Sequence, residues 1–215
     1  MHSNSVESAQ PFLADPHCFG MTEHPSASIE RAKIPSQALL SLPRADGELA
    51  LDPLPLHLSL GLAYTVGSAI GTHPPSTDSC LAAFVLPNGV GLSAGARAWS
   101  KHAHRSQPQD PSENARKTAE SSAGWWGRPF GPKAVLNERA LALFWKVMNA
   151  ATWRNLHWLP HQILVYEVRV AEGYGMRWSQ DRSGVQGDGY DITAWTFRGF
   201  VEPMMEGGHE VGWRH

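Results

Sequence analysis

The chain has 215 residues and a formal net charge of −2 at pH 7. This length allows one domain with extensions, or at most two small domains. The nearly balanced charge excludes a globally basic nucleic-acid binder, although it leaves room for a local basic patch. The 20 glycines and 16 prolines predict many turns and few long elements.

The cysteines and the apolar runs indicate the cellular context. Cys18 and Cys80 belong to no paired metal motif, which predicts two free thiols in a reducing compartment. The N-terminus shows no basic start followed by an apolar stretch, so no secretory signal is expected. The most apolar run, residues 53–70, is interrupted by prolines, glycines, His57 and Ser59 and makes a poor membrane span. We expect a cytoplasmic protein without a membrane partner, and the oligomeric state stays open.

The first part of the chain predicts little regular structure. Residues 1–50 are rich in Ser, Pro and Ala and show no sustained period, which indicates an irregular N-terminal extension with a short helix near Ser36–Leu42. Residues 51–215 are expected to form a single domain. Within it, residues 56–70 fit either a helix or a buried strand, and the pattern leaves both open.

The middle of the chain predicts a hairpin and then a long loop. Two short apolar runs flank Asn88-Gly89, a dipeptide whose residues tolerate positive φ, so residues 81–93 predict two antiparallel strands. Residues 100–122 are strongly polar and predict a long connection whose second half is disordered.

The last ninety residues are expected to be the densest ordered unit and the seat of any chemical site. Asn137 is a good N-cap for a helix that runs to about residue 151, and Pro160 marks its latest end. Apolar residues that recur every three or four positions mark one helical face: Leu141, Phe144, Trp145 and Met148.

Three strands are predicted after this helix. Residues 162–170 are rich in β-branched residues, and polar residues alternate with apolar ones from residue 165 on. Residues 175–179 are the returning strand after a turn at Glu172-Gly173, and residues 194–202 form the third strand, which ends at Pro203. The predicted class is α+β, with one principal helix packed on an antiparallel sheet of five or six strands that includes the 81–93 hairpin. The Trp125-Trp126 pair fits core packing better than base stacking.

The C-terminal tail holds the predicted catalytic residues His209, Glu210 and His215. Their H-E-x4-H spacing differs from the zincin pattern and glycines disfavour a helix, so we expect no metal and no cofactor. Histidine titrates near neutral pH, which favours general acid–base chemistry. The alternative is a solvated surface tail.

A second cluster comprises Lys101, His102, His104 and Arg105. In an extended segment His102 and His104 would point the same way, and the neighbouring positive charges would attract an anion rather than a metal. The last three of these residues are therefore predicted to bind substrate. The alternative is an exposed polar loop.

The predicted strands carry a third set of candidates. Arg177 and Arg198 lie beside glycine or aromatic residues and are predicted to hold an anionic substrate with their guanidinium forks, and Glu202 is added to the acid–base residues. Glu167 and Arg169 are interpreted instead as a structural pair on a solvated sheet face.

Three functions fit these patterns. The first is a small enzyme that uses His and Glu for acid–base catalysis on a small anionic substrate or RNA, including phosphodiester cleavage. Its layout of one helix and an antiparallel sheet with Glu, Arg and His resembles that of small barnase-like ribonucleases, which implies RNA cleavage without a metal. The alternatives are an enzyme with a tryptophan-lined pocket for a small organic molecule and a binding module without catalysis.

Overall fold

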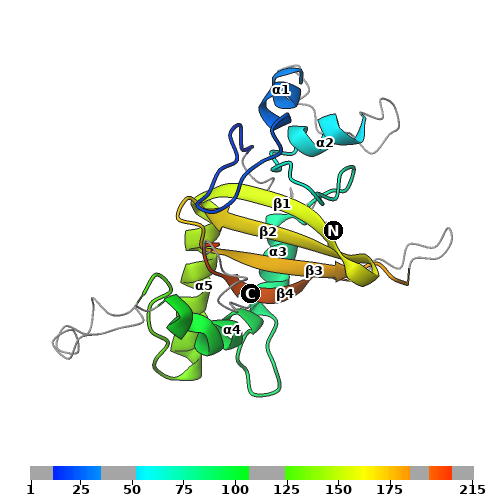
Figure 1. Ribbon diagram of the computed structural model, residues 1–215. Helices are drawn as coiled ribbons and strands as arrows, with labels where there is room; N and C mark the ends of the chain where they lie inside the picture. The colour runs from blue at the N-terminus through cyan, green and yellow to red at the C-terminus, as the bar shows by residue number, and fades with distance from the viewer. Residues whose placement is uncertain (1–11, 35–51, 107–123, 185–193, 205–215) are drawn as a thin grey trace, which may run out of the picture.

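The structure is a computed structural model that describes residues 12–34, 52–106, 124–184 and 194–204 (Figure 1). Its centre is a sheet of four antiparallel strands in the order β1-β2-β3-β4. The bounds of the strands are β1 Ala151–Leu159, β2 Ile163–Val170, β3 Gly175–Asp181 and β4 Thr196–Val201. The predicted α+β class is confirmed, and the three predicted strands correspond to β2, β3 and β4.

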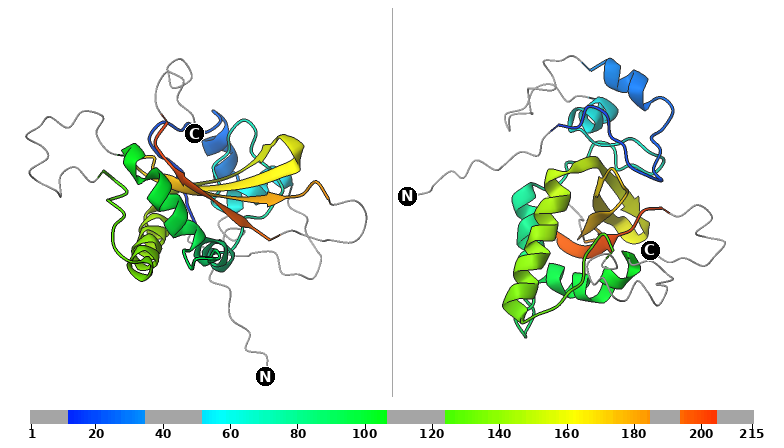
Figure 2. Two further views of the ribbon diagram at one scale, coloured as in Figure 1. Left: turned by 90° about the horizontal axis from the view of Figure 1, so that it is seen from below. Right: turned by 90° about the vertical axis from the view of Figure 1, so that its left-hand side faces the viewer.

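Helices cover one face of this sheet, and the N-terminal segments lie toward its β1 edge (Figures 1 and 2). The covering helices are α3 Thr77–Val85, α4 Ala94–His102 and α5 Lys133–Asn149. The N-terminal helices are α1 Ala27–Ala32 and α2 Pro53–Ser59, and two 3₁₀ turns are η1 Ala103–Ser106 and η3 Pro160–Gln162. None of the helices in the described part of the chain is long and apolar enough to cross a membrane.

The predicted hairpin over residues 81–93 is wrong, because this segment joins two helices. Residues 81–85 complete α3, whose start is capped by Ser76 accepting from the Ser79 backbone N–H. Cys80, Ala83 and Phe84 recur at helical spacing and are buried, so tertiary packing selects the helix. The turn itself is present: the Asn88 side chain accepts hydrogen bonds from the N–H groups of residues 90 and 92.

The principal helix begins earlier and ends earlier than expected. Helix α5 starts at Lys133 after Pro132, so Asn137 lies inside it, and its amide bonds Gly91 O and Ser93 N instead of capping the helix. The face that the structure buries is Ala140, Phe144, Val147 and Met148, while Trp145 is 38% exposed. Residues 151–159, which were not predicted as a strand, form β1. The sheet has four strands in the described part of the chain instead of five or six, because residues 81–93 contribute none.

Two other segments differ from the prediction or complete it. Residues 100–106 are helical, in α4 and η1, rather than a loop, and residues 56–70 are the end of α2 followed by turns. The cysteines are two free, buried thiols, as predicted. The predicted helix near residues 36–42 and the rest of the polar loop lie outside the described residues. Part of the N-terminal extension is folded: residues 17 and 19 donate backbone hydrogen bonds to Thr152 O and Ala171 O.

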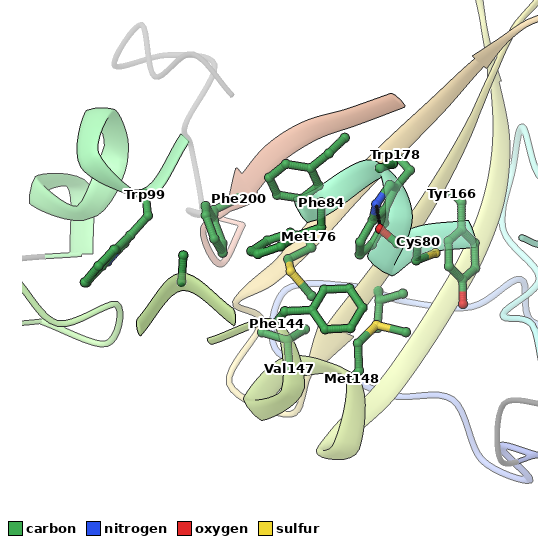
Figure 3. Packing of buried hydrophobic residues seen from close by; sticks show 14 of the residues in the cluster. Cys80, Phe84, Trp99, Phe144, Val147, Met148, Tyr166, Met176, Trp178 and Phe200 are labelled. Atoms are coloured by element: carbon green, nitrogen blue, oxygen red, sulfur yellow. Dashed lines mark hydrogen bonds between the residues drawn. The ribbon is translucent and has the colours of Figure 1, made fainter. Parts of the chain in front are cut away.

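The core lies between the sheet and its covering helices (Figure 3). The Phe84 ring is fully buried, with its centroid 5.1 Å from that of Phe144 and 4.7 Å from that of Phe197. The indole N–H of Trp178 donates to Cys80 O at 3.0 Å, which ties β3 to α3. Trp126 is also buried, so its predicted core role is confirmed.

Helix α4 approaches α3 closely because residue 95 has no side chain. A Cβ atom on Gly95 would lie 2.1 Å from the Phe84 ring. We expect Gly95→Ala to lower the free energy of unfolding by about 1–3 kcal/mol, because the buried ring must move. Urea denaturation measures the change. Gly184→Ala is the matched control, since nothing lies within 4 Å of its Cβ position; equal stability of the two variants would contradict this packing.

Candidate active site

The face of the sheet opposite the covering helices is polar. Side chains alternate along a strand, so Asn155 and His157 of β1 point away from the core to which Leu156 contributes. The register places Asn155 opposite Glu167, and Glu167 opposite Arg177. A row of polar side chains therefore crosses three neighbouring strands, with His157 beside it on the same face.

The centre of this face is an ion cluster formed by Glu167, Arg169 and Arg177. Arg169 Nε donates to Glu167 Oε1 at 2.6 Å, and Arg177 Nε pairs with the second oxygen, Glu167 Oε2. The side chains of Arg169 and Glu167 are 0% and 3% exposed, whereas that of Arg177 is 28% exposed. The cluster thus has a buried inner pair and one outer guanidinium that reaches solvent.

The backbone around the cluster is shaped to hold Arg169. Its Nη1 donates to Glu202 O at 2.8 Å and to Gly173 O. Gly175 stands beside it on β3, where a Cβ atom would lie 2.8 Å from the Arg169 Cγ and 2.1 Å from Val168 O. A side chain at residue 175 would therefore displace both the strand and the guanidinium.

The cluster sets the charge states of its neighbours. Burial by itself would raise the pKa of Glu167, but the two guanidinium groups outweigh it and hold the pKa at about 2. Burial lowers the pKa of His157 below 6.5; the Glu167 carboxylate opposes this, while Arg177 and Arg169 add to it. At neutral pH the site therefore contains a carboxylate, two guanidinium groups and a neutral imidazole.

These side chains line one cavity of about 270 Å³. The lining residues come from the polar face, from the N-terminal segments and from the end of β4; they are Met21, Thr65, Val66, Gly67, Asn155, His157, Trp158, Glu167, Arg169, Arg177 and Met204. Within the described residues, no group of three His, Cys, Asp or Glu side chains is placed to hold a metal ion. The expectation of no cofactor stays a prediction.

One wall of the cavity is the loop of residues 65–68, and Asn155 fastens it to the sheet. The Asn155 amide donates to Thr65 Oγ1 at 2.9 Å, and its oxygen accepts from Ser68 Oγ at 3.1 Å. The same loop bonds to the outer edge of β1, where Ala69 N donates to Leu156 O at 2.7 Å. The unpaired edge of the sheet is thereby covered next to the cavity.

The N-terminal segment supports this loop from behind. Glu23 and Arg31 form a two-point ion pair with N···O distances of 2.7 and 3.0 Å. The Glu23 carboxylate also accepts from Tyr64 N at 2.8 Å, and Arg31 donates to Leu62 O at 3.3 Å. The position of the cavity wall thus depends on residues far from the sheet in the sequence.

The structure brings only some of the predicted site residues together. Arg177 lines the cavity, whereas Arg198 is exposed on β4 and is not among the lining residues. Glu202 is buried and supports Arg169 through its carbonyl. His102 and His104 lie in α4 and η1, with the helices that cover the other face. Arg105 lies in η1, and the tail residues His209, Glu210 and His215 lie outside the described residues.

Sequence reasoning missed the centre of the site. Glu167 and Arg169 were expected on a solvated face but are almost fully buried. Asn155 and His157 were not considered, because residues 151–159 were left between the helix and Pro160. The signal was present as alternation in Trp153-Arg-Asn-Leu-His157, which places Trp153, Asn155 and His157 on one side of a strand.

Comparison with known families decides the relationship of this chain. Residues 86–202, more than half of the sequence, match the family model described as the CdiA C-terminal tRNase toxin domain. The chain belongs to this family. It is thus a member of a family of RNA-cleaving nucleases, which agrees with the predicted RNA substrate. No curated protein and no solved structure matches the chain.

The matched region divides the cavity into two parts. It contains the whole sheet and the residues of the polar face: Asn155, His157, Glu167, Arg169 and Arg177. The wall formed by Met21 and residues 65–67 lies before it in the sequence. The polar centre of this tRNase-family domain is therefore within the family match, and the N-terminal wall is not.

The inner ion pair yields a stability prediction. Glu167→Gln removes the carboxylate next to the fully buried Arg169, so we expect the free energy of unfolding at neutral pH to fall by about 3–5 kcal/mol. Urea denaturation measures it. Glu30→Gln, which removes an exposed pair with Lys33, is the control and is expected to cost about 0–1 kcal/mol.

The contribution of the Glu167 carboxylate to the free energy of unfolding should depend on pH. The pKa of Glu167 is lowered from 4.5 to about 2, so its contribution to stability is complete above pH 4.5 and is lost as the pH falls toward 2. The stability difference between the parent and Glu167→Gln should therefore shrink over that range. A difference that does not change with pH would show that the carboxylate is not ion-paired.

Proposed function

We propose that this domain cleaves the phosphodiester backbone of transfer RNA in the cavity on the polar face of the sheet. His157 is the proton-transfer residue and Arg177 binds the phosphate. The observation that carries the proposal is that one cavity joins a neutral imidazole and a solvent-reaching guanidinium. An enzyme acting on transfer RNA would work in the cytoplasm, in line with the expected localisation.

The geometry suits Arg177 to phosphate binding. Its Nε is occupied by Glu167, and its terminal nitrogens have no hydrogen-bond acceptor among the described residues. These two nitrogens are free to donate to phosphate oxygens in a fixed orientation, because the ion pair holds the guanidinium. One carboxylate facing two guanidinium groups leaves the cluster with a net positive charge, which favours the charge that grows on the phosphate during cleavage.

His157 is suited to accept a proton. Neither ring nitrogen is bonded to another described side chain or backbone group, and its lowered pKa keeps the ring neutral at pH 7. The ring takes the proton of a ribose 2′-hydroxyl, whose oxygen attacks the adjacent phosphorus while the bond from phosphorus to the 5′-oxygen breaks. The leaving oxygen takes a proton from solvent, and the imidazolium returns its proton to solvent. The products are a 2′,3′-cyclic phosphate and a 5′-hydroxyl.

The cavity favours a segment of polymer over a separate small molecule. Its volume of about 270 Å³ is just below the ~300–1,000 Å³ of pockets that enclose small ligands. Among the described tryptophans only Trp158 lines it, while Trp126, Trp153 and Trp178 are fully buried in the cores. The alternative of a tryptophan-lined pocket therefore has no support in this part of the chain.

The C-terminal tail carries further candidates for proton transfer. His209, Glu210 and His215 are candidates to replace solvent as the donor of the proton that the leaving oxygen takes. Glu202 has a different task, since its carbonyl holds Arg169. Comparing His209→Ala with His157→Ala in the same assay ranks the tail against the cavity.

Removing the imidazole tests the proposal directly. We expect His157→Ala to lower kcat for transfer RNA cleavage by about 10²–10⁴-fold, because the proton acceptor is lost. Gel analysis of cleaved transfer RNA measures the rate, and urea denaturation checks that the variant is folded. His73→Ala, which alters an exposed histidine away from the cavity, is the control. Full activity of folded His157→Ala would exclude His157 as the proton-transfer residue.

The lowered pKa of His157 gives a second test. A base is active only when deprotonated, so kcat/KM should fall at acidic pH with a midpoint below 6.5, the ordinary value for histidine. The pH–rate profile measures this midpoint. Arg177→Gln removes a charge that lowers this pKa and should move the midpoint upward. A midpoint above 6.5 in the parent protein would contradict a buried, neutral base.

A further inference from the structure

A row of basic side chains follows the outer face of α4 and η1. Arg97, Lys101 and His104 are spaced by four and three residues, which places them on one side of a helix, and all three are exposed. The opposite side is buried and consists of Gly95, Ala96, Trp99 and Ala103. We call Arg97, Lys101 and His104 the α4 ridge.

Among the described residues, the α4 ridge has no acidic partner. Residues 94–106 contain no Asp or Glu. The ion pairs of the described residues involve other side chains, and none of the described hydrogen bonds engages a ridge side chain. In a chain with a net charge of −2, a row of exposed basic side chains is a local feature that attracts polyanions.

The α4 ridge lies on the outer side of a helix whose buried side packs toward the strand that borders the site. Helix α4 packs against β4, the edge strand of the sheet, and both views show the two side by side (Figures 1 and 2). Strand β4 pairs Gly199 with Arg177 of the cavity and carries the exposed Arg198. A nucleic-acid strand that turns around the β4 edge from Arg177 would meet the exposed Arg198 before it reaches the α4 ridge.

We propose that the α4 ridge is a second contact site for the phosphate backbone of the RNA substrate, separate from the site of cleavage. The inference rests on the proposed function, because it assumes that the scissile phosphate lies at Arg177. It differs from the sequence prediction, which had His102 and His104 pointing the same way in an extended segment. In a helix His102 turns away from His104 and is half-buried, so Lys101 and Arg97 share the exposed face with His104 instead.

Binding measurements test the α4 ridge without cleavage. The probe is a 2′-O-methyl RNA hairpin, which lacks the attacking hydroxyl, and its binding is followed by fluorescence anisotropy from ~50 to ~200 mM salt. For the Arg97→Gln/Lys101→Gln variant we expect Kd to rise about tenfold and the slope of log Kd against log salt to fall by about 2, since two phosphate contacts are lost. Lys33→Gln is the control, because it removes an exposed charge on the side of α1; its Kd and slope should match those of the parent.

Cleavage of a short substrate separates this inference from the proposed function. Arg177 lines the cavity on one face of the sheet, and the α4 ridge is on the outer side of a helix that packs on the other face. A dinucleotide bound at Arg177 should therefore not contact the ridge, and the double variant should cleave it with the parent kcat/KM. An unchanged Kd and slope for the hairpin, or an equal loss in Lys33→Gln, would overturn the inference. If His157→Ala remained active instead, the cleavage site would be wrong, and hairpin binding would still decide whether the ridge binds RNA.

Discussion

The buried Glu167 carboxylate, held between Arg169 and Arg177, is the interaction on which the functional face depends. Both carboxylate oxygens are used, one for each guanidinium. A buried carboxylate is costly unless it is paired, and here Arg169, besides pairing with it, bonds the carbonyls of Gly173 and Glu202 through Nη1. Its other terminal nitrogen, Nη2, is buried without a hydrogen-bond partner in the described part of the chain. One carboxylate therefore joins β2, β3, the turn between them and the end of β4, and it leaves a positive charge facing the cavity.

The two faces of the sheet divide stability from chemistry. One face packs Phe84, Phe144 and Trp178 into a continuous core (Figure 3). The other face uses the alternate residues of the same strands to hold Asn155, His157 and the ion cluster. Because the alternation has a period of two, the core that fixes the register also fixes which polar side chains meet. The apolar face thus positions the site without contacting it.

The N-terminal residues extend the family domain at the site itself. The matched region begins at residue 86, and the cavity wall at residues 65–67 precedes it in the sequence. Asn155 joins the two parts, because its amide binds Thr65 and Ser68. The polar centre supplies the charges common to the proposed chemistry, and the added wall narrows the space around them.

The sequence by itself determined the α+β class and strands β2, β3 and β4, because β-branched and aromatic side chains suit the pleated, half-buried surface of a sheet. It also indicated Arg177 and an RNA substrate among its alternatives. The strands predicted over residues 81–93 do not form. A short apolar run fits a helix and a strand equally well, and only the packing of Phe84 selects the helix. Sequence reasoning missed His157, and it interpreted Glu167 and Arg169 as a surface pair. Only the tertiary structure decided the helix at residues 81–85, the position of His157 and the burial of the Glu167–Arg169 pair. Burial and cross-strand register bring together residues from three strands, and neither can be read from a local stretch of sequence.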